Sequence, residues 1–312
     1  MAAMTPVLQQ DDPVVVPRRR RRKLGVYGLL VPAAILMGVA LGYPLVRQFV
    51  ISFQEYGLRQ QFGQPAEWVG LQNYVDLLTD PYVWTVIGRS IVFCLVNAAA
   101  TMLVGVAFAV LMSRIGKASR ITLQVSLLLA WGTPVLASMT VWQWLFDSQY
   151  GVINWVLSNV FGLEGMAGHS WIIEPLSFYL VATVIVVWMS VPFVAFSVYA
   201  GLLQVPEETM EAAQLDGASA RQRFWNITMP MVRPVLSIVL LLQVIWDFKV
   251  FTQIYVLQRA GAPTRETNLL GTLIYSYSDE FSLAGALATI MLVITLALTG
   301  FYIRQMLKED EL

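Results

Sequence analysis

Six long and nearly uncharged segments place the strongest constraint on the fold of this chain. They cover residues 24–46, 90–113, 121–146, 175–206, 234–257 and 281–303, and only the fifth contains charged side chains. A helix needs roughly 20 mostly apolar residues to cross the hydrocarbon core of a bilayer. The composition agrees, because 57% of the 312 residues are hydrophobic and 13% are charged, against roughly a quarter charged in soluble domains. We therefore predict an all-α polytopic membrane protein with six transmembrane helices.

Lysine and arginine residues are distributed unevenly between the two sides of this topology. They gather at 18–23, 114–120, 221–233 and the C-terminus, and none lies between 147 and 174. Short loops rich in these residues stay in the cytoplasm. We therefore expect a multi-pass inner-membrane protein with both termini in the cytoplasm.

The tail at residues 1–23 is expected to be a disordered basic segment that anchors this topology, rather than a specific lipid or nucleic-acid site. A secretory signal peptide cleaved near residues 40–42 is the alternative. We reject it because the apolar run is longer than the usual hydrophobic region and continues past that point.

A polar helical hairpin is predicted in the loop after the fourth segment. Pro206 suits the first position of a short helix, because its φ is already helical and its missing N–H is not needed there. Gly217 should end that helix in a left-handed conformation. Ser219 and Gln222 have the spacing of a capping box for a second short helix. That helix should end before Pro230, which disfavours the helical conformation in the preceding residue.

The first helix of this hairpin carries little side-chain bulk on part of its surface. Ala212 and Ala213 allow another protein to approach the backbone closely, while Glu211 offers a charge. This combination indicates a docking surface.

The spacing of the hairpin residues resembles the EAA signature of permease subunits in binding-protein-dependent ABC importers. The matching positions are Glu211, Ala212, Ala213, Asp216, Gly217, Ala218, Ile227 and Pro230. The sequence departs at Met229, where the family has leucine, a change of similar volume that should matter little. The resemblance implies a type I importer permease domain at 24–312, in which the hairpin at 206–230 is the coupling helix that docks on a cytoplasmic ATPase dimer. A plain loop that contains Glu-Ala-Ala by chance is the alternative, and the full spaced set argues against it.

Short aromatic motifs outside the membrane core resemble the sugar-specific branch of that family, and within it the first of two paired permeases. They lie at 68–74, 144–155 and 254–263. The resemblance implies a homologous second permease and an extracytoplasmic solute-binding protein as partners, with a sugar, most simply an oligosaccharide, as substrate. Glycerol-3-phosphate, an amino acid or another small solute is the alternative, because Trp and Tyr gather at membrane interfaces in any case.

Similarity to the maltose-type permease also implies candidate substrate-binding residues in the fourth and fifth spans. They are Trp188, Ser190, Phe193, Trp246, Asp247 and Lys249. Trp188 matches a sugar-stacking tryptophan without a gap, whereas the positions in the fifth span match only with one deletion near Arg233.

Asp247 and Lys249 also carry an argument of their own. Ionised groups inside a span are costly and usually face a cavity or a partner. Two residues apart on a helix, they lie on different sides and are not expected to neutralise each other. A structural ion pair with the second permease, or a shallow position, is the alternative to lining the cavity.

The sequence offers no candidate for catalysis, for a cofactor or for a metal. It has one cysteine, Cys94, and one histidine, His169, and no phosphate-binding Gly-x-x-x-x-Gly-Lys-Ser/Thr motif. ATP and Mg²⁺ are therefore expected on a separate ATPase subunit. The rival class, a membrane enzyme or scaffold that does not transport, should show clustered His, Asp or Cys at the membrane surface, and the sequence has no such cluster.

Overall fold

Residues 24–309 are described by a computed structural model, and the chain is divided into two units between Arg47 and Gln48. The predicted basic tail at 1–23 lies outside the described residues. The first unit is helical and comprises α1 (Leu24–Met37), the π-helical turn η1 (Gly38–Gly42) and the start of α2 (Tyr43–Ile51). The wide turn of η1 lies directly before Pro44, whose ring would otherwise meet a carbonyl one turn earlier. An apolar stretch of 22 residues, Leu30–Ile51, is long enough to span a membrane.

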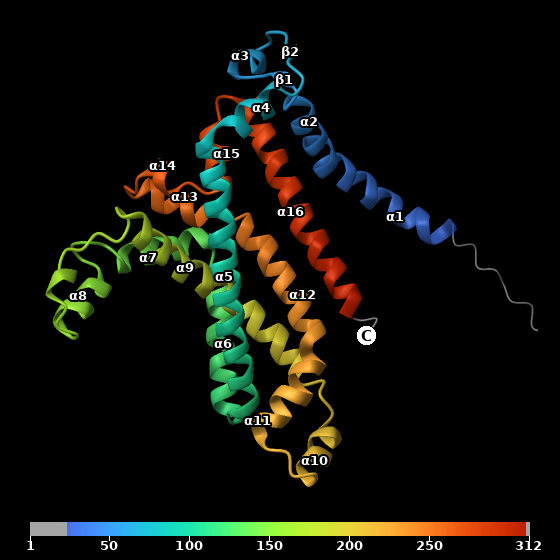
Figure 1. Ribbon diagram of the computed structural model, residues 1–312, viewed down its shortest axis with the longest axis vertical. Helices are drawn as coiled ribbons and strands as arrows, with labels where there is room; N and C mark the ends of the chain where they lie inside the picture. The colour runs from blue at the N-terminus through green and yellow to red at the C-terminus, as the bar shows by residue number, and fades with distance from the viewer. Residues whose placement is uncertain (1–23, 310–312) are drawn as a thin grey trace, which may run out of the picture. The chain divides into compact units, whose positions relative to one another are not determined.

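The second unit is almost entirely helical (Figure 1). Its elements before the hairpin are β1 (Gln54–Glu55), α3 (Leu58–Gln61), β2 (Glu67–Trp68), α4 (Gln72–Thr79), α5 (Pro81–Arg114), α6 (Lys117–Gly132), α7 (Val135–Leu145), α8 (Val152–Asn159), η2 (Glu164–Met166) and α9 (Pro175–Leu202). The remaining elements are α10 (Glu207–Leu215), α11 (Ala220–Arg223), η3 (Phe224–Thr228), α12 (Met229–Phe248), α13 (Thr252–Arg259), α14 (Thr264–Thr267), α15 (Leu270–Ser276) and α16 (Phe281–Glu309). The two short strands pair antiparallel, with Gln54 opposite Trp68 and Glu55 opposite Glu67.

The predicted all-α membrane fold is confirmed. Within residues 24–309, five helices are long and apolar enough to span a membrane, and the bent pair α6 and α7 would make a sixth span. The third predicted span is therefore not a straight helix, because α6 and α7 meet at 102°. Pro134 explains the bend, since it lacks a backbone N–H and pushes Thr133 out of the helical conformation.

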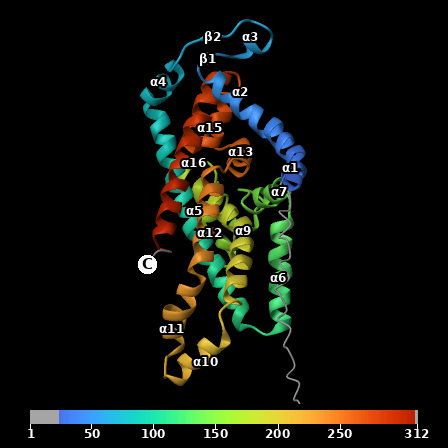
Figure 2. The ribbon, with the colours of Figure 1, turned by 90° about the vertical axis from the view of Figure 1, so that its right-hand side faces the viewer.

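The core of the second unit lies where α5 and α9 cross. Gly105 of α5 allows the close approach, because a Cβ there would come within 2.5 Å of Val194 Cγ1 on α9. Ala109, Ala195 and Val198 are buried in the same cluster. Small residues one turn apart are the usual means by which membrane helices approach closely. Figure 2 shows α12 running beside these two helices.

The second predicted helix of the hairpin does not end before Pro230, so that expectation was wrong. Helix α11 continues through the π-helical turn η3 directly into α12. The wider π turn just before Pro230 provides the room that its ring requires. The hairpin is therefore joined to the fifth span without a break.

Candidate functional site

Helix α10 ends in a Schellman turn, which agrees with the left-handed helix end expected at Gly217. Gly217 has a φ of +82°. The N–H of Ala218 donates to Ala213 O at 2.9 Å, and the N–H of Gly217 donates to Gln214 O at 3.1 Å. These two bonds satisfy carbonyls that a helix end leaves unpaired.

A capping box starts the second arm, which confirms the prediction from Ser219 and Gln222. Ser219 N–H donates to Gln222 Oε1 at 2.8 Å, and Gln222 N–H donates to Ser219 Oγ at 3.3 Å. The arms are also joined to each other, because Arg223 Nη1 donates to Gln214 Oε1 at 2.7 Å. These hydrogen bonds together define the shape of the turn between α10 and α11.

Helices α10 and α11 lie at one end of the second unit (Figures 1 and 2), and six of the eight signature residues fall in α10 or in the turn between them. Those at the tip are exposed or half-buried: Glu211, Ala212, Ala213, Asp216, Gly217 and Ala218. Farther along, Ile227 is half-buried and Pro230 is exposed. The signature residues of the tip therefore lie together on a surface open to a partner.

Sequence reasoning missed Leu215 and Trp225. Leu215 is 90% exposed at the end of α10, and Trp225 of η3 is also exposed. An apolar side chain with almost no contact inside its own chain is a natural anchor for a partner's pocket. The signal in the sequence was a leucine next to Asp216, at the end of a short helix that carries three glutamates.

A cavity of about 240 Å³ lies beneath the hairpin. Its walls include Ser113 and Arg114 from the end of α5, Met210 from α10 and Phe224 from η3. Thr228 Oγ1 donates to Met210 Sδ at 3.8 Å. The hairpin thus contacts the ends of the membrane helices as well as continuing into α12.

Aromatic side chains gather on the exposed side of α9. Trp188 is 36% exposed and lies edge-on to Trp142 of α7, with ring centroids 5.6 Å apart. Phe193 lies 4.9 Å from Trp246 of α12 and 6.5 Å from Trp131 of α6. The structure therefore brings together Phe193 and Trp246 of the fourth and fifth spans, places Trp188 in a separate ring contact, and adds Trp131 and Trp142 to these groups. These two were missed because only the bend at Pro134 brings both arms of the third segment beside α9.

The polar candidates differ in burial, and Lys249 lies one residue beyond the end of α12. Lys249 is exposed, whereas Asp247 is only 3% exposed and its Oδ1 accepts a hydrogen bond from Gln243 Nε2 at 2.9 Å. Asp247 Oδ2 has no partner among the described residues. Asp247 and Lys249 therefore differ in exposure, and Asp247 does not share the exposed face of Trp246. That either residue lines the cavity stays a prediction. Ser190 is half-buried on α9.

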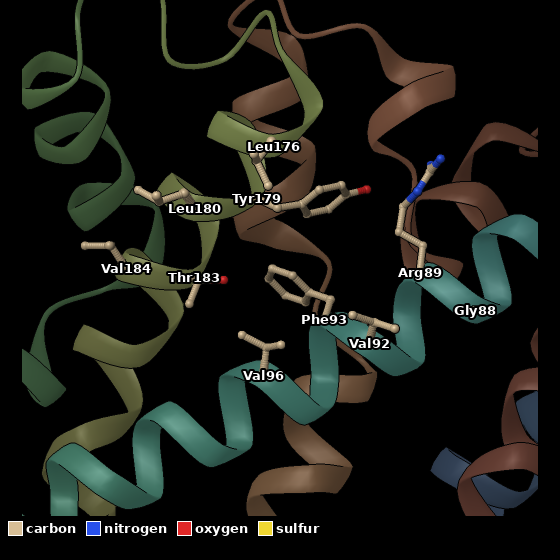
Figure 3. A pocket seen from close by; sticks show the side chains of 10 residues that line it. All are labelled: Gly88, Arg89, Val92, Phe93, Val96, Leu176, Tyr179, Leu180, Thr183 and Val184. Carbon is tan, nitrogen blue, oxygen red and sulfur yellow. The ribbon is translucent and has the colours of Figure 1, made fainter.

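An apolar cavity of about 580 Å³ lies between α5 and α9 (Figure 3). Val92, Val96 and Leu180 line it together with the rings of Phe93 and Tyr179, which lie 5.7 Å apart. Arg89 at the rim donates to Asn268 O at 3.2 Å. With so few polar groups, this cavity does not suit a polyhydroxylated ligand.

No group of three or more His, Cys, Asp or Glu side chains that could hold a metal ion occurs in the described part of the chain. Cys94 is buried and its Sγ donates to Val244 O at 3.3 Å, which fixes α5 to α12.

These features define a class, the helical membrane protein with a structured polar hairpin that joins two of its spans. Residues 102–309 match the family of binding-protein-dependent transport system inner membrane components, and the chain belongs to that family. It is 41% identical over 297 residues to the diacetylchitobiose uptake system permease protein of Streptomyces coelicolor, covering 94% of this chain and 89% of that protein. It is also 29% identical to the trehalose/maltose transport system permease protein of Thermococcus litoralis, covering 91% and 94%.

A solved bacterial ABC transporter involved in alginate import has a similar fold. Its matching chain superposes with a TM-score of 0.78 at 20% identity, covering 91% of this chain and 95% of that one. This likeness supports the fold of the ABC importer permease.

Proposed function

We propose that this chain forms half of the translocation path of an ATP-driven importer, and that a homologous second permease forms the other half. The observation that carries the proposal is the hairpin, in which the Schellman turn at Gly217 and the capping box at Ser219 hold the exposed Glu211 and Leu215 at the end of a rigid arm. The chain would lie in the inner membrane with both termini in the cytoplasm. A solute-binding protein would deliver substrate from the other side.

The proposed coupling runs through continuous helix. An ATPase dimer that holds ATP and Mg²⁺ would bind the tip of α10, and its closure would move both hairpins. Since α11 passes through η3 into α12 without a break, displacement of the hairpin would reach Trp246 directly. The bonds from Arg223 to Gln214 and from Thr228 to Met210 would keep α10 from moving alone.

The proposed substrate is a sugar, most simply an oligosaccharide. Trp188, Phe193 and Trp246 offer aromatic faces on which sugar rings can stack, and Ser190 and Lys249 lie near them in sequence with hydrogen-bonding groups. Asp247 would contribute by holding the side chain of Gln243 in place in the wall of the translocation path, and not by direct contact with the sugar. The relatives support a sugar, because two of them are named for diacetylchitobiose and for trehalose and maltose.

Uptake by the reconstituted complex tests this function. The two permeases, the ATPase and the binding protein would be placed in proteoliposomes with ATP inside, and radiolabelled diacetylchitobiose, maltose, trehalose, glycerol-3-phosphate and an amino acid would be offered in turn. We expect ATP-dependent accumulation of at least one of the three sugars and of neither other solute. Accumulation of glycerol-3-phosphate or of the amino acid alone would overturn the sugar assignment while leaving the importer assignment intact.

A further inference from the structure

A third cavity lies beyond the residues assigned to the substrate path, at the outer end of α7 and α13. Its volume is about 530 Å³. Gln143, Phe146, Asp147, Ser170 and Arg259 are among its lining residues. An aromatic face combined with amide, hydroxyl, carboxylate and guanidinium groups is the set of partners that a sugar ring requires.

Two of the polar groups of this outer cavity, Gln143 and Asp147, are held in place by hydrogen bonds. Gln143 Nε2 donates to Val256 O at 3.1 Å, which ties α7 to α13. Asp147 Oδ1 accepts from the N–H groups of Gln149 and Tyr150 at 2.8 and 2.7 Å. These bonds lower the pKa of Asp147 below its ordinary value, with Tyr150 the larger cause, so the carboxylate is charged at neutral pH. Pre-positioned groups bind a ligand at a smaller entropic cost than mobile ones.

A row of ring contacts connects the outer cavity with Trp188. We name it the aromatic ladder, formed by Trp171, Phe146, Trp142 and Trp188. Phe146 lies 5.6 Å from Trp171 and is stacked on Trp142 at 6.0 Å, and Trp142 lies 5.6 Å from Trp188. Phe146 is thus both a wall of the cavity and a member of the ladder.

We infer that the outer cavity is a second carbohydrate subsite, which holds a unit of a neutral oligosaccharide beyond the unit stacked on Trp188. This inference rests on the proposed function. The lining contains one cationic and one anionic side chain, Arg259 and Asp147, so their formal charges cancel. Such a site favours a neutral polyhydroxylated ligand over an acidic one. A disaccharide would not need it, whereas a longer chain would reach it along the ladder.

The test compares two lengths of one sugar series in the full reconstituted complex. Uptake of diacetylchitobiose and of its tetrasaccharide homologue would be measured with saturating binding protein in the parent and in Phe146→Ala and Arg259→Ala. We expect each variant to lower the ratio of tetrasaccharide to disaccharide uptake about threefold to tenfold, the effect of one lost stacking or hydrogen-bonding partner. Ser170→Trp, which fills the cavity, should lower the same ratio and provides a variant that removes no existing contact of Phe146 or Arg259.

Matched controls are Phe161→Ala and Arg59→Ala, which change exposed residues of the same types outside this cavity. Both should keep the parental ratio. A parental ratio in all three cavity variants would overturn the subsite while leaving the proposed function standing. Absence of uptake of either sugar by the parent complex, with the other sugars also refused, would instead overturn the proposed function and the subsite with it.

Discussion

Trp188 is the residue on which the sugar assignment can be tested most simply. Its ring is partly exposed and lies edge-on to Trp142. Trp188→Ala should raise the sugar concentration for half-maximal uptake, or abolish uptake, while the complex still assembles, because the exposed part of the ring is not used in packing. The comparison is Trp155→Ala, an exposed tryptophan of α8. Unchanged uptake kinetics in Trp188→Ala would mean that this ring only packs.

Leu215 is the residue whose exposure is hardest to explain within this chain alone. Burial of a leucine side chain contributes about 1.5 to 3 kcal/mol. Leu215→Ala should therefore weaken attachment of the ATPase by roughly tenfold or more, with no loss of the permease from the membrane. Titration of the purified permease pair with ATPase would measure this change, and Leu203→Ala, another exposed leucine, should leave attachment unchanged. Equal affinity of the Leu215→Ala complex would exclude an anchoring role.

At the scale of elements, the crossing of α5 and α9 depends on one glycine. A methyl group at Gly105 would come within 2.5 Å of Val194 Cγ1. Gly105→Ala should lower stability by about 1 to 3 kcal/mol, the usual effect of overpacking a core. The thermal midpoint of the detergent-solubilised complex would show the loss. Gly88→Ala, on the same helix but with nothing within 4 Å of the added Cβ, should cause no such loss, and an equal loss in the two variants would contradict this packing.

Some of these structural elements could be predicted from the sequence, and others could not. The apolar segments predicted the membrane helices because spanning length is a local property of the sequence. The turn at Gly217 and the cap at Ser219 could be predicted for the same reason, since their bonds connect residues only a few positions apart. The bend at Pro134 and the unbroken path through Pro230 were missed. A proline can end, bend or pass through a helix, and the π turn at η3 that permits the last outcome has no simple signal in the sequence.

The same distinction applies to the candidate site. Trp188, Phe193 and Trp246 could be proposed from resemblance, but their neighbours Trp131 and Trp142 depend on how α6 and α7 fold back. Different sides for Asp247 and Lys249 were expected from helical spacing, but α12 ends at Phe248, one residue before Lys249. Which of the two faces inward depends on the packing of α12 against α5, which is a long-range property.

At the scale of the whole molecule, the chain lacks a nucleotide-binding motif and belongs to a family of transport components. We predict that the purified permease neither binds nor hydrolyses ATP, and that hydrolysis appears only when an ATPase subunit is co-expressed. Equilibrium binding of labelled ATP to the isolated chain checks this prediction. Stoichiometric binding would place the nucleotide site in this chain and contradict the division of labour.

Coupling through the hairpin is the central claim, and two substitutions test it with different physical effects. Gly217→Asp would force a side chain into a φ of +82°, at a cost of roughly 1 kcal/mol or more, and would distort the turn. Glu211→Lys would reverse an exposed charge that we propose meets a cation on the ATPase. Neither change touches the aromatic surface of α9.

The decisive measurement is sugar-stimulated ATP hydrolysis and sugar uptake in proteoliposomes, made alongside co-purification of the ATPase. We predict that Gly217→Asp and Glu211→Lys both insert normally and leave the sugar affinity of the binding protein unchanged, yet greatly reduce uptake because attachment or coupling is weakened. Full attachment together with full coupled transport in both variants would contradict the assignment of the hairpin, and with it the functional account.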